Sequence, residues 1–177
     1  MAFEVSPDGS NASITVSPKA SDQPGSARRA APMQSFNDVA DMRISLARTA
    51  RAESVAALNQ ILADTMTLRD LYKKHHWQTS GATFYELHLL FDKHHGEQEE
   101  LVDAIAERIQ TLGGISIAMA ADVVETTMLA HPPRDSEEPV LQLVRLIDAH
   151  ERVLYGVRVA VRCVLPRSAT TALMTSR

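Results

Sequence analysis

Hydrophobic positions after about residue 50 recur at intervals of three and four residues, the period of an amphipathic helix. Between Glu53 and Gln78 they fall on one broad face, and good helix formers are frequent there. This pattern predicts a first long helix over residues 53–78. Its buried face is expected to contain Leu58, Ile61, Leu62, Thr65, Leu68, Tyr72 and His76.

A turn and a second long helix follow. Gly81 can take the positive φ that ends a helix, and Thr83 is expected to cap the next helix, with Glu86 as the acid of a capping box. This second helix is predicted from Phe84 to Leu112, where Gly113-Gly114 stops it. Its core candidates are Phe84, Leu87, Phe91, Leu101, Ile105, Ile109 and Leu112.

A third long helix is predicted from Glu138 to Val164, after a short one over residues 122–128. Pro166 is expected to end it, and residues 169–176 suffice for only two helical turns, about 12 Å. The fold class is therefore all-α, with three long helices and an apolar groove that no long fourth helix covers. The buried seam of the third helix is expected to contain Val140, Leu143, Ile147, His150, Leu154, Val157, Val161 and Val164.

Composition separates a tail from a domain. Residues 1–35 are rich in Ser, Ala, Pro and Gly without periodicity, which predicts a disordered N-terminal tail before a helical domain over residues 36–177. The net charge of −4 excludes a global attraction to nucleic acid, although Arg28 and Arg29 of the tail could touch DNA. A single cysteine, and the lack of a long apolar run or a secretory signal, lead us to expect a cytoplasmic protein.

Two histidines flank the predicted turn. His76 lies five residues before Gly81 and His88 seven residues after it, and residues at such places in a helical hairpin face each other. Asp92 lies four residues after His88 and shares its helix face. Two imidazoles and one carboxylate suit iron, manganese or zinc, and such sets often bind non-haem Fe(II).

A second acidic pair, Asp103 and Glu107, lies on the same helix face. Eleven residues separate Asp92 from Asp103, about 16 Å along the axis and about three turns. Because metal–oxygen bonds are about 2.0–2.2 Å long, one helix cannot bring both carboxylates to one ion. An identical helix across a two-fold axis would join each His/Asp pair to the partner's Asp/Glu pair, forming two equivalent sites.

Each of these residues also has a simpler interpretation. Charged residues on a helix usually form a solvated face, and single histidines pack or form hydrogen bonds more often than they bind metal. His94 and His95 are expected to be ordinary mid-helix residues rather than a second metal site. His150 is expected to be a hydrogen-bonded core histidine, and Trp77 either a redox-active aromatic or a buried packing residue.

The region from Leu58 to Gly114 closely resembles the Dps mini-ferritins, the DNA-binding proteins from starved cells. It reads LNQILADTMTLRDLYKKHHWQTSGATFYELHLLFDKHHGEQEELVDAIAERIQTLGG. A weaker match extends through LIDAHERVL, from Leu146 to Leu154. The resemblance covers somewhat more than a third of the chain, and its ligand motif is highly specific.

The resemblance implies a ferritin-like four-helix bundle that assembles into a hollow dodecamer. It implies oxidation of Fe(II) by hydrogen peroxide or oxygen and storage of the ferric mineral, which protects the cell and its DNA from oxidative damage. Two irons, or a single iron, would be bound between subunits. Carried over by position, the ferroxidase ligands are His76, His88 and Asp92 of one subunit, with Asp103 and Glu107 of its two-fold mate.

The chain departs from this family at both ends. DNA-binding tails of the family usually contain several lysines, whereas this tail is neutral, so at most weak non-specific DNA binding is expected. The run VLPRSATTALMTSR does not resemble the start of the family's fourth helix, so the chain is expected to be C-terminally truncated. Two rival hypotheses are a DNA-compacting nucleoid protein with little ferroxidase activity, and a truncated product that does not assemble.

Overall fold

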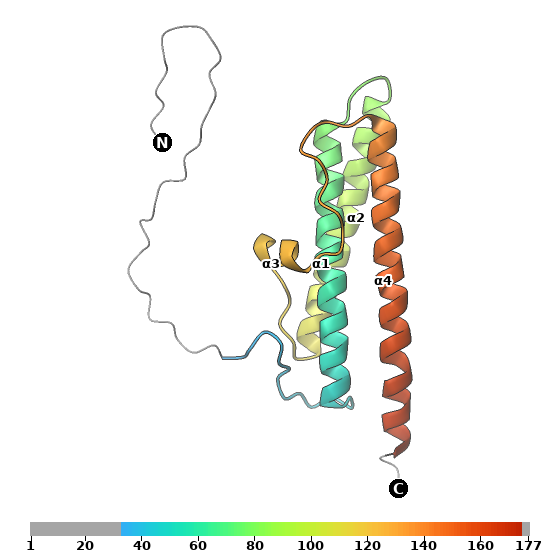
Figure 1. The fold of residues 1–177 in the computed structure, drawn as a ribbon. Helices are drawn as coiled ribbons and strands as arrows, with labels where there is room; N and C mark the ends of the chain where they lie inside the picture. The colour runs from blue at the N-terminus through green and yellow to red at the C-terminus, as the bar shows by residue number, and fades with distance from the viewer. Residues whose placement is uncertain (1–32, 175–177) are drawn as a thin grey trace, which may run out of the picture. The chain divides into compact units, whose positions relative to one another are not determined.

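The computed structural model describes residues 33–174, with side chains as far as Cys163. Its helices are α1 (Arg48–Gln78), α2 (Phe84–Thr111), α3 (Ala120–Thr126) and α4 (Pro139–Met174), and residues 33–174 contain no strand. The three long helices run side by side, with the short α3 beside α1 (Figure 1). The prediction of an all-α fold is confirmed. The predicted tail lies almost entirely in residues 1–32, outside the described part of the chain.

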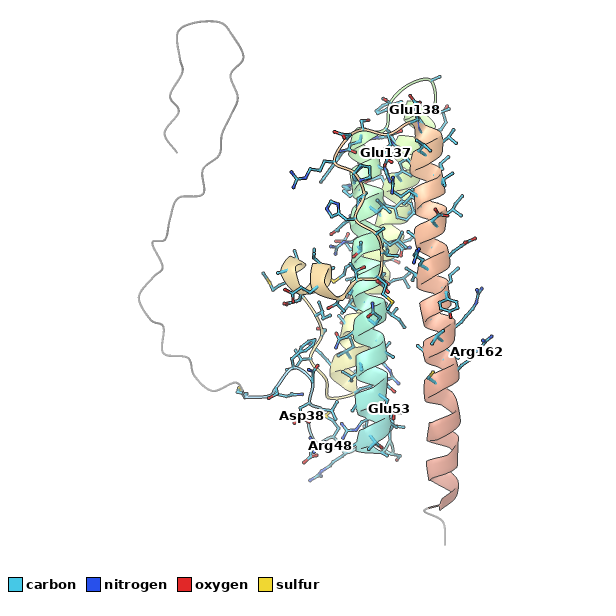
Figure 2. All side chains as sticks on the ribbon, in the orientation of Figure 1. Asp38, Arg48, Glu53, Glu137, Glu138 and Arg162 are labelled. Carbon is cyan, nitrogen blue, oxygen red and sulfur yellow. The ribbon has the colours of Figure 1, made fainter. Side chains whose placement is uncertain are left out.

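Helix α1 begins at Arg48, earlier than the predicted Glu53. Arg48 pairs with Asp38 over 2.6 Å at this end of the helix (Figure 2). Arg51 is buried, and its Nη1 donates to the carbonyls of Ala40 (2.7 Å) and Leu112 (3.0 Å). Carbonyls at a helix C-terminus lack partners within the helix, so one buried arginine stabilises the start of α1 and the end of α2 together.

The turn between α1 and α2 is closed by backbone atoms. Gly81 has the predicted positive φ, +89°, and its carbonyl accepts from the Phe84 N–H at 3.2 Å. The capping-box prediction is wrong, because the Thr83 side chain makes no capping hydrogen bond. Thr83 has φ −98° and ψ 16° rather than the extended conformation usual for a side-chain N-cap.

The end of α2 agrees with the predicted glycine stop. The helix ends at Thr111, and Gly113 takes φ +83°. A Cβ added to Gly114 would lie only 2.5 Å from Cγ1 of Val55. Glycine at 114 therefore allows the chain to pass close to α1 as it leaves α2.

Two apolar clusters form the core. One lies around the start of α1 and the end of α2 and contains Val39, Val55, Leu62, Ala63, Ile109, Leu112, Ile117 and Val123. The other lies towards the α1–α2 turn and contains Leu68, Leu71, Tyr72, Phe91, Leu129, Leu146 and Ala149. Most predicted core positions of α1 and α2 are at least partly buried, whereas Phe84 and Leu101 are exposed.

Two buried polar side chains of α1 fasten the connection between α2 and α4. Asn59 donates to the Ile115 carbonyl and accepts from the Ile117 N–H, both at 2.9 Å. Asp64 accepts from the Thr127 hydroxyl at 2.9 Å and from the Met128 N–H at 2.7 Å. These bonds satisfy backbone and hydroxyl groups of a long connection that has only the short α3 as regular structure.

The predicted seam of α4 is wrong at several positions. Val140, Ile147, Leu154 and Val161 are exposed, and Val164 lies outside the described side chains. Among the described side chains of α4, the buried ones are Gln142, Leu146 and Ala149. The three-and-four spacing fits two neighbouring strips of this helix, and the strip with the small Ala149 lies against the core. The exposed strip agrees with the expected uncovered apolar surface, and α2 also exposes the large apolar residues Tyr85, Leu89, Leu90 and Leu101.

Helix α4 also continues where a stop was predicted. It runs through Pro166 to Met174, so the prediction that Pro166 ends it is wrong. Proline removes one backbone hydrogen bond and bends a helix, and the turns on both sides can still form. Within the described residues, no helix is both long and apolar enough to cross a membrane.

Candidate metal centre

The α1–α2 hairpin brings His76 and His88 into direct contact. Their rings stack with centroids 3.7 Å apart, and the Phe84 ring stacks on His88 at 5.0 Å. Nδ1 of His76 lies 2.9 Å from the His88 carbonyl oxygen, and Nδ1 of His88 lies 3.0 Å from the His76 carbonyl oxygen. The predicted convergence of the two histidines is confirmed.

These reciprocal bonds determine the chemistry of both imidazoles. A carbonyl oxygen can only accept, so each Nδ1 must hold a proton and donate it. In the neutral ring Nε2 is then an unprotonated nitrogen with a free lone pair. Histidine ligands of metals commonly have this arrangement, with the other ring N–H bonded to a carbonyl. Both histidines are thus held in a tautomer suited to binding a metal through Nε2.

Asp92 lies beside this pair. Its Oδ1 is 3.9 Å from Nε2 of His76 and 2.8 Å from Nζ of Lys73. The Lys73 ammonium, bonded to the carboxylate, holds the pKa of Asp92 below its ordinary value. Two donors that each lie about 2.0–2.2 Å from one ion are roughly 3–4 Å apart, so Asp92 and His76 fit the coordination of one metal.

Asp103 and Glu107 lie further along α2, on its exposed surface. Among the described residues, the side chains of Asp103 and Glu107 form no hydrogen bond or ion pair. No group of three or more His, Cys, Asp or Glu residues in the described part could by itself hold a metal ion. The structure therefore unites His76, His88 and Asp92 loosely and leaves Asp103 and Glu107 apart from them.

Several proteins are similar to this chain in helical arrangement and in sequence. The ferritin-like domain family matches residues 55–161. DpsC from Streptomyces coelicolor has a structure that matches with a TM-score of 0.75 and 45% sequence identity, over 77% of this chain and 79% of that one. The chain belongs to the Dps family of ferritin-like proteins.

Two further relatives of this Dps-family chain differ in how much of their length it covers. An uncharacterized protein of Kitasatospora aureofaciens is 48% identical over 136 residues, which are 77% of this chain and 91% of that protein. The DNA protection during starvation protein of Halobacterium salinarum is 37% identical over 107 residues, 60% of this chain. The chain spans just over half, 56%, of the length of the Halobacterium protein.

The other histidines considered in this Dps-family chain, and Trp77, differ in burial and in hydrogen bonding. His94 Nδ1 lies 2.8 Å from Glu97, and His150 Nε2 lies 2.7 Å from the Tyr72 hydroxyl, so the prediction of a hydrogen-bonded His150 is confirmed. His95 is partly buried. Trp77 is 74% exposed, so a buried packing role within this chain is wrong, and a redox role stays a prediction.

Sequence reasoning missed two residues next to the site. Lys73 is the partner of Asp92, and only the paired helices bring it there. His75 is fully buried with neither ring nitrogen hydrogen-bonded, and burial lowers its pKa to about 4. The hydroxyl of Thr79 and Oε1 of Gln142 are also buried without partners. Nothing in the sequence around His75 and His76 distinguishes the buried His75 from its neighbour.

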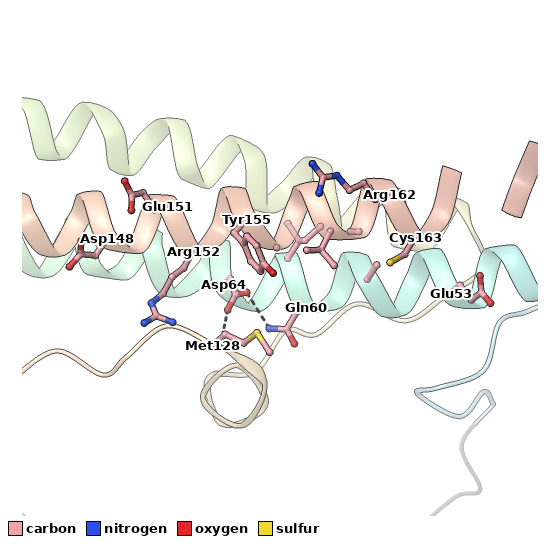
Figure 3. A pocket seen from close by; sticks show the side chains of 15 residues that line it. Glu53, Gln60, Asp64, Met128, Asp148, Glu151, Arg152, Tyr155, Arg162 and Cys163 are labelled. Atoms are coloured by element: carbon pink, nitrogen blue, oxygen red, sulfur yellow. Dashed lines mark hydrogen bonds between the residues drawn. The ribbon is translucent and has the colours of Figure 1, made fainter. Parts of the chain in front are cut away.

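A groove between α1 and α4 is a separate feature of the molecule. It has a volume of about 1380 Å³, and its lining includes Asp64, Arg152 and Tyr155 (Figure 3). Within it, Gln60 donates to Asp64 at 3.2 Å. None of the five predicted ligand residues lines this groove. The candidate metal centre is therefore identified by its ligand chemistry rather than by the size of a cavity.

Proposed function

We propose that this chain oxidises Fe(II) with hydrogen peroxide or oxygen and stores the ferric product. The site would combine His76, His88 and Asp92 of one subunit with Asp103 and Glu107 of the partner subunit. The principal support is the pair of reciprocal His–carbonyl bonds, which leave both Nε2 atoms as free ligands beside Asp92. Membership of the Dps family agrees with this proposal, as does the similar fold of a Dps protein from Vibrio cholerae that is described as a member of a superfamily of ferritin-like diiron-carboxylate proteins.

The residues of the chain have distinct parts in this chemistry. The neutral imidazoles supply nitrogen donors that bind Fe(II), and the carboxylates supply hard oxygen donors that favour Fe(III). Two Fe(II) ions each give up one electron, and one hydrogen peroxide molecule accepts both and becomes two hydroxide ions. Because the peroxide receives both electrons at one place, no hydroxyl radical leaves the site.

Asp103 and Glu107 would complete this site in a two-fold dimer. Both side chains are exposed and have no partner among the described residues, as groups reserved for a second subunit would be. The exposed apolar residues of α2 and α4 give such an assembly surface to bury. We expect these dimers to build a dodecamer, whose mass light scattering after size-exclusion chromatography would measure. A monomer under all conditions would contradict the shared site.

Anaerobic addition of Fe(II) followed by peroxide, with ferric absorbance as readout, tests the oxidation. We expect rapid oxidation by the wild type and a rate near that of buffer for His76→Ala and for Asp103→Asn. Asp122→Asn, which removes an exposed acid of α3, serves as the matched control and should retain the wild-type rate. Equal rates for all four proteins would refute the assigned site.

Protection of DNA would follow from the same chemistry, because consuming Fe(II) and peroxide together removes the reagents that form hydroxyl radicals. Relatives bear names such as nutrient stress-induced DNA-binding protein. Direct contact with DNA is a second candidate function, and its predicted residues, Arg28 and Arg29, lie outside the described part of the chain. A gel shift at low salt tests it, with loss of the shift expected for the Arg28→Ala/Arg29→Ala double variant.

A further inference from the structure

A buried tyrosine–histidine pair lies close to the candidate metal centre. Tyr72 of α1 is 5% exposed, and its hydroxyl oxygen lies 2.7 Å from Nε2 of His150 of α4. Its ring packs against Phe91 and His94 of α2, with centroids 6.3 and 5.4 Å away. Three helices thus surround one phenol, and none of the five predicted ligand residues contacts it in these interactions.

The surroundings of the pair favour a protonated phenol and a neutral imidazole. Burial, with a smaller contribution from Glu97, raises the pKa of the Tyr72 phenol. Burial, with a smaller contribution from His94, lowers the pKa of His150. The phenol is therefore protonated and the imidazole neutral near pH 7, and in the tautomer with its proton on Nδ1 His150 can accept the Tyr72 hydrogen through Nε2. A base within 2.6–3.2 Å is placed to accept a proton directly.

Such a pair has a chemical use that an isolated tyrosine lacks. Removing an electron from a phenol makes it a strong acid, and a buried phenol without a base cannot lose the proton. Here the proton moves only along the existing hydrogen bond to His150. Electron loss from Tyr72 therefore leaves a neutral phenoxyl radical and an imidazolium, without an unpaired proton in the core.

The position of Tyr72 relates it to both parts of the half-site on this chain. It lies four residues before His76, just over one helical turn or about 6 Å along α1. Its packing partner Phe91 directly precedes Asp92 and also lies 6.1 Å, between ring centroids, from His75. The phenol is thus linked to the ligand residues through α1 and through its packing partner Phe91.

We infer that the Tyr72–His150 pair is a one-electron donor to the iron site, used when peroxide meets a single bound Fe(II). This inference rests on the proposed ferroxidase function. Fe(II) gives one electron and becomes Fe(III), Tyr72 gives the second, and the O–O bond of hydrogen peroxide breaks to give two hydroxide ions. The phenolic proton passes to His150. A later Fe(II) reduces the phenoxyl radical, and the proton returns from His150.

The chain offers matched controls for this inference. It has three tyrosines, and the other two, Tyr85 and Tyr155, are 68% and 70% exposed. The exposed Trp77, next to His76, is the competing aromatic donor. Tyr72→Phe removes only the hydroxyl and retains the packing with Phe91. His150→Gln retains a hydrogen-bonding group but replaces the proton acceptor with a weak base.

The experiment uses full-length protein loaded anaerobically with less than one Fe(II) per subunit and then mixed with hydrogen peroxide. Freeze-quench electron paramagnetic resonance measures the radical, and a spin trap in parallel samples measures released hydroxyl radical. We expect a tyrosyl signal in the wild type and in Tyr85→Phe/Tyr155→Phe. The signal should be lost in Tyr72→Phe and strongly reduced in His150→Gln, while the hydroxyl adduct increases in both.

Two results would overturn the inference. One is a tyrosyl signal that persists in Tyr72→Phe or disappears in the exposed-tyrosine control. The other is a tryptophanyl signal that disappears in Trp77→Phe, with unchanged spin-trap yields in Tyr72→Phe. Ferric absorbance at excess Fe(II) distinguishes these failures from failure of the proposed function. If the proposed function fails, the wild type does not oxidise iron; if only the Tyr72 inference fails, it still does. Circular dichroism checks that each variant is folded.

Discussion

The two ends of α2 contain the two halves of the predicted ligand set in opposite settings. At its start, His88 and Asp92 are engaged with His76 and Lys73 of α1. Towards its end, Asp103 and Glu107 are exposed, and no residue in the described part of the chain pairs with their side chains. In the proposed function, one helix would thus present a half-site organised by its own hairpin and a half-site that another chain completes. Folding and assembly would then each supply part of one active centre.

Mixing two inactive variants tests most directly whether two chains share the site. His76→Ala and Asp103→Asn/Glu107→Gln should each lose nearly all ferroxidase activity. After dissociation and joint reassembly, half of the dimers combine both variants, and one of their two sites contains no substitution. Activity should therefore return to about a quarter of the wild-type value. Recovery of none in confirmed mixed dimers would contradict a site shared between chains.

Substitutions of apolar residues along α2 should differ in how their effect on the free energy of unfolding depends on assembly. Phe91 is fully buried within the chain and Leu101 is 50% exposed. Phe91→Ala should lower the free energy of unfolding by about 3–5 kcal/mol at any protein concentration. Leu101→Ala should cost less than about 1 kcal/mol in the dissociated chain. Urea unfolding over a range of concentrations measures both.

The two variants also supply each other's control. The cost of Leu101→Ala should grow with protein concentration if a second subunit buries this residue, since assembly stabilises only the folded chain. A concentration-independent cost for Leu101→Ala equal to that of Phe91→Ala would remove the distinction between the two ends.

In the metal-free protein, acid should destabilise the end of the bundle at the α1–α2 turn before it destabilises the opposite end. Burial lowers the pKa of His75 from its ordinary 6.5 to about 4, so the folded chain holds this imidazole neutral. Its contribution to stability is present above pH 6.5 and is lost as the pH falls towards 4, by roughly 3 kcal/mol. Amide hydrogen exchange should show earlier opening at Leu87–Phe91 than at Ile105–Ile109.

His75→Leu should remove most of this acid sensitivity, because it replaces a buried titratable group with an apolar one of similar size. His131→Gln, which changes an exposed histidine, is the control and should leave the pH profile as it is. Equal acid sensitivity in wild type and His75→Leu would assign the effect to other groups.

The smallest expected effect concerns the ion pair at the organised half-site. Lys73 lies 2.8 Å from Asp92, so at the proposed site it would compete with an incoming cation for the carboxylate. Exposed ion pairs are weak, so Lys73→Gln should tighten Fe(II) binding only slightly, by less than about five-fold. Anaerobic titration calorimetry measures this, and Lys93→Gln, which breaks the separate pair with Glu97, is the control. Weaker binding in Lys73→Gln would show that the lysine assists the site.

Sequence periodicity predicted most of this fold because helix length and turn position depend on local signals. Gly81 and Gly113 take the positive φ that their places suggested. The face that α4 buries was not predictable in the same way. Leu146 and Ile147 are adjacent apolar residues, and only contact with α1 decides that the first is buried and the second exposed.

The candidate site was predictable to the same degree. Spacing around the turn was sufficient to bring His76 and His88 together, since a short hairpin admits few arrangements. The ion pair between Lys73 and Asp92 depends on the rotation of one helix against another, which periodicity does not determine. The role of all five ligand residues remains a prediction that the iron experiments above would test.

The reciprocal bonds of His76 and His88 have a consequence for comparing related chains. The His76 carbonyl lies in the last turn of α1, where carbonyls lack partners within the helix, and the His88 ring satisfies it. A lineage that abandoned iron would still gain stability from keeping both imidazoles. Carboxylates at 103 and 107 have no such structural reason to persist within the single chain. Natural variation at those two positions should therefore report the retention or loss of iron chemistry more faithfully than the histidines do.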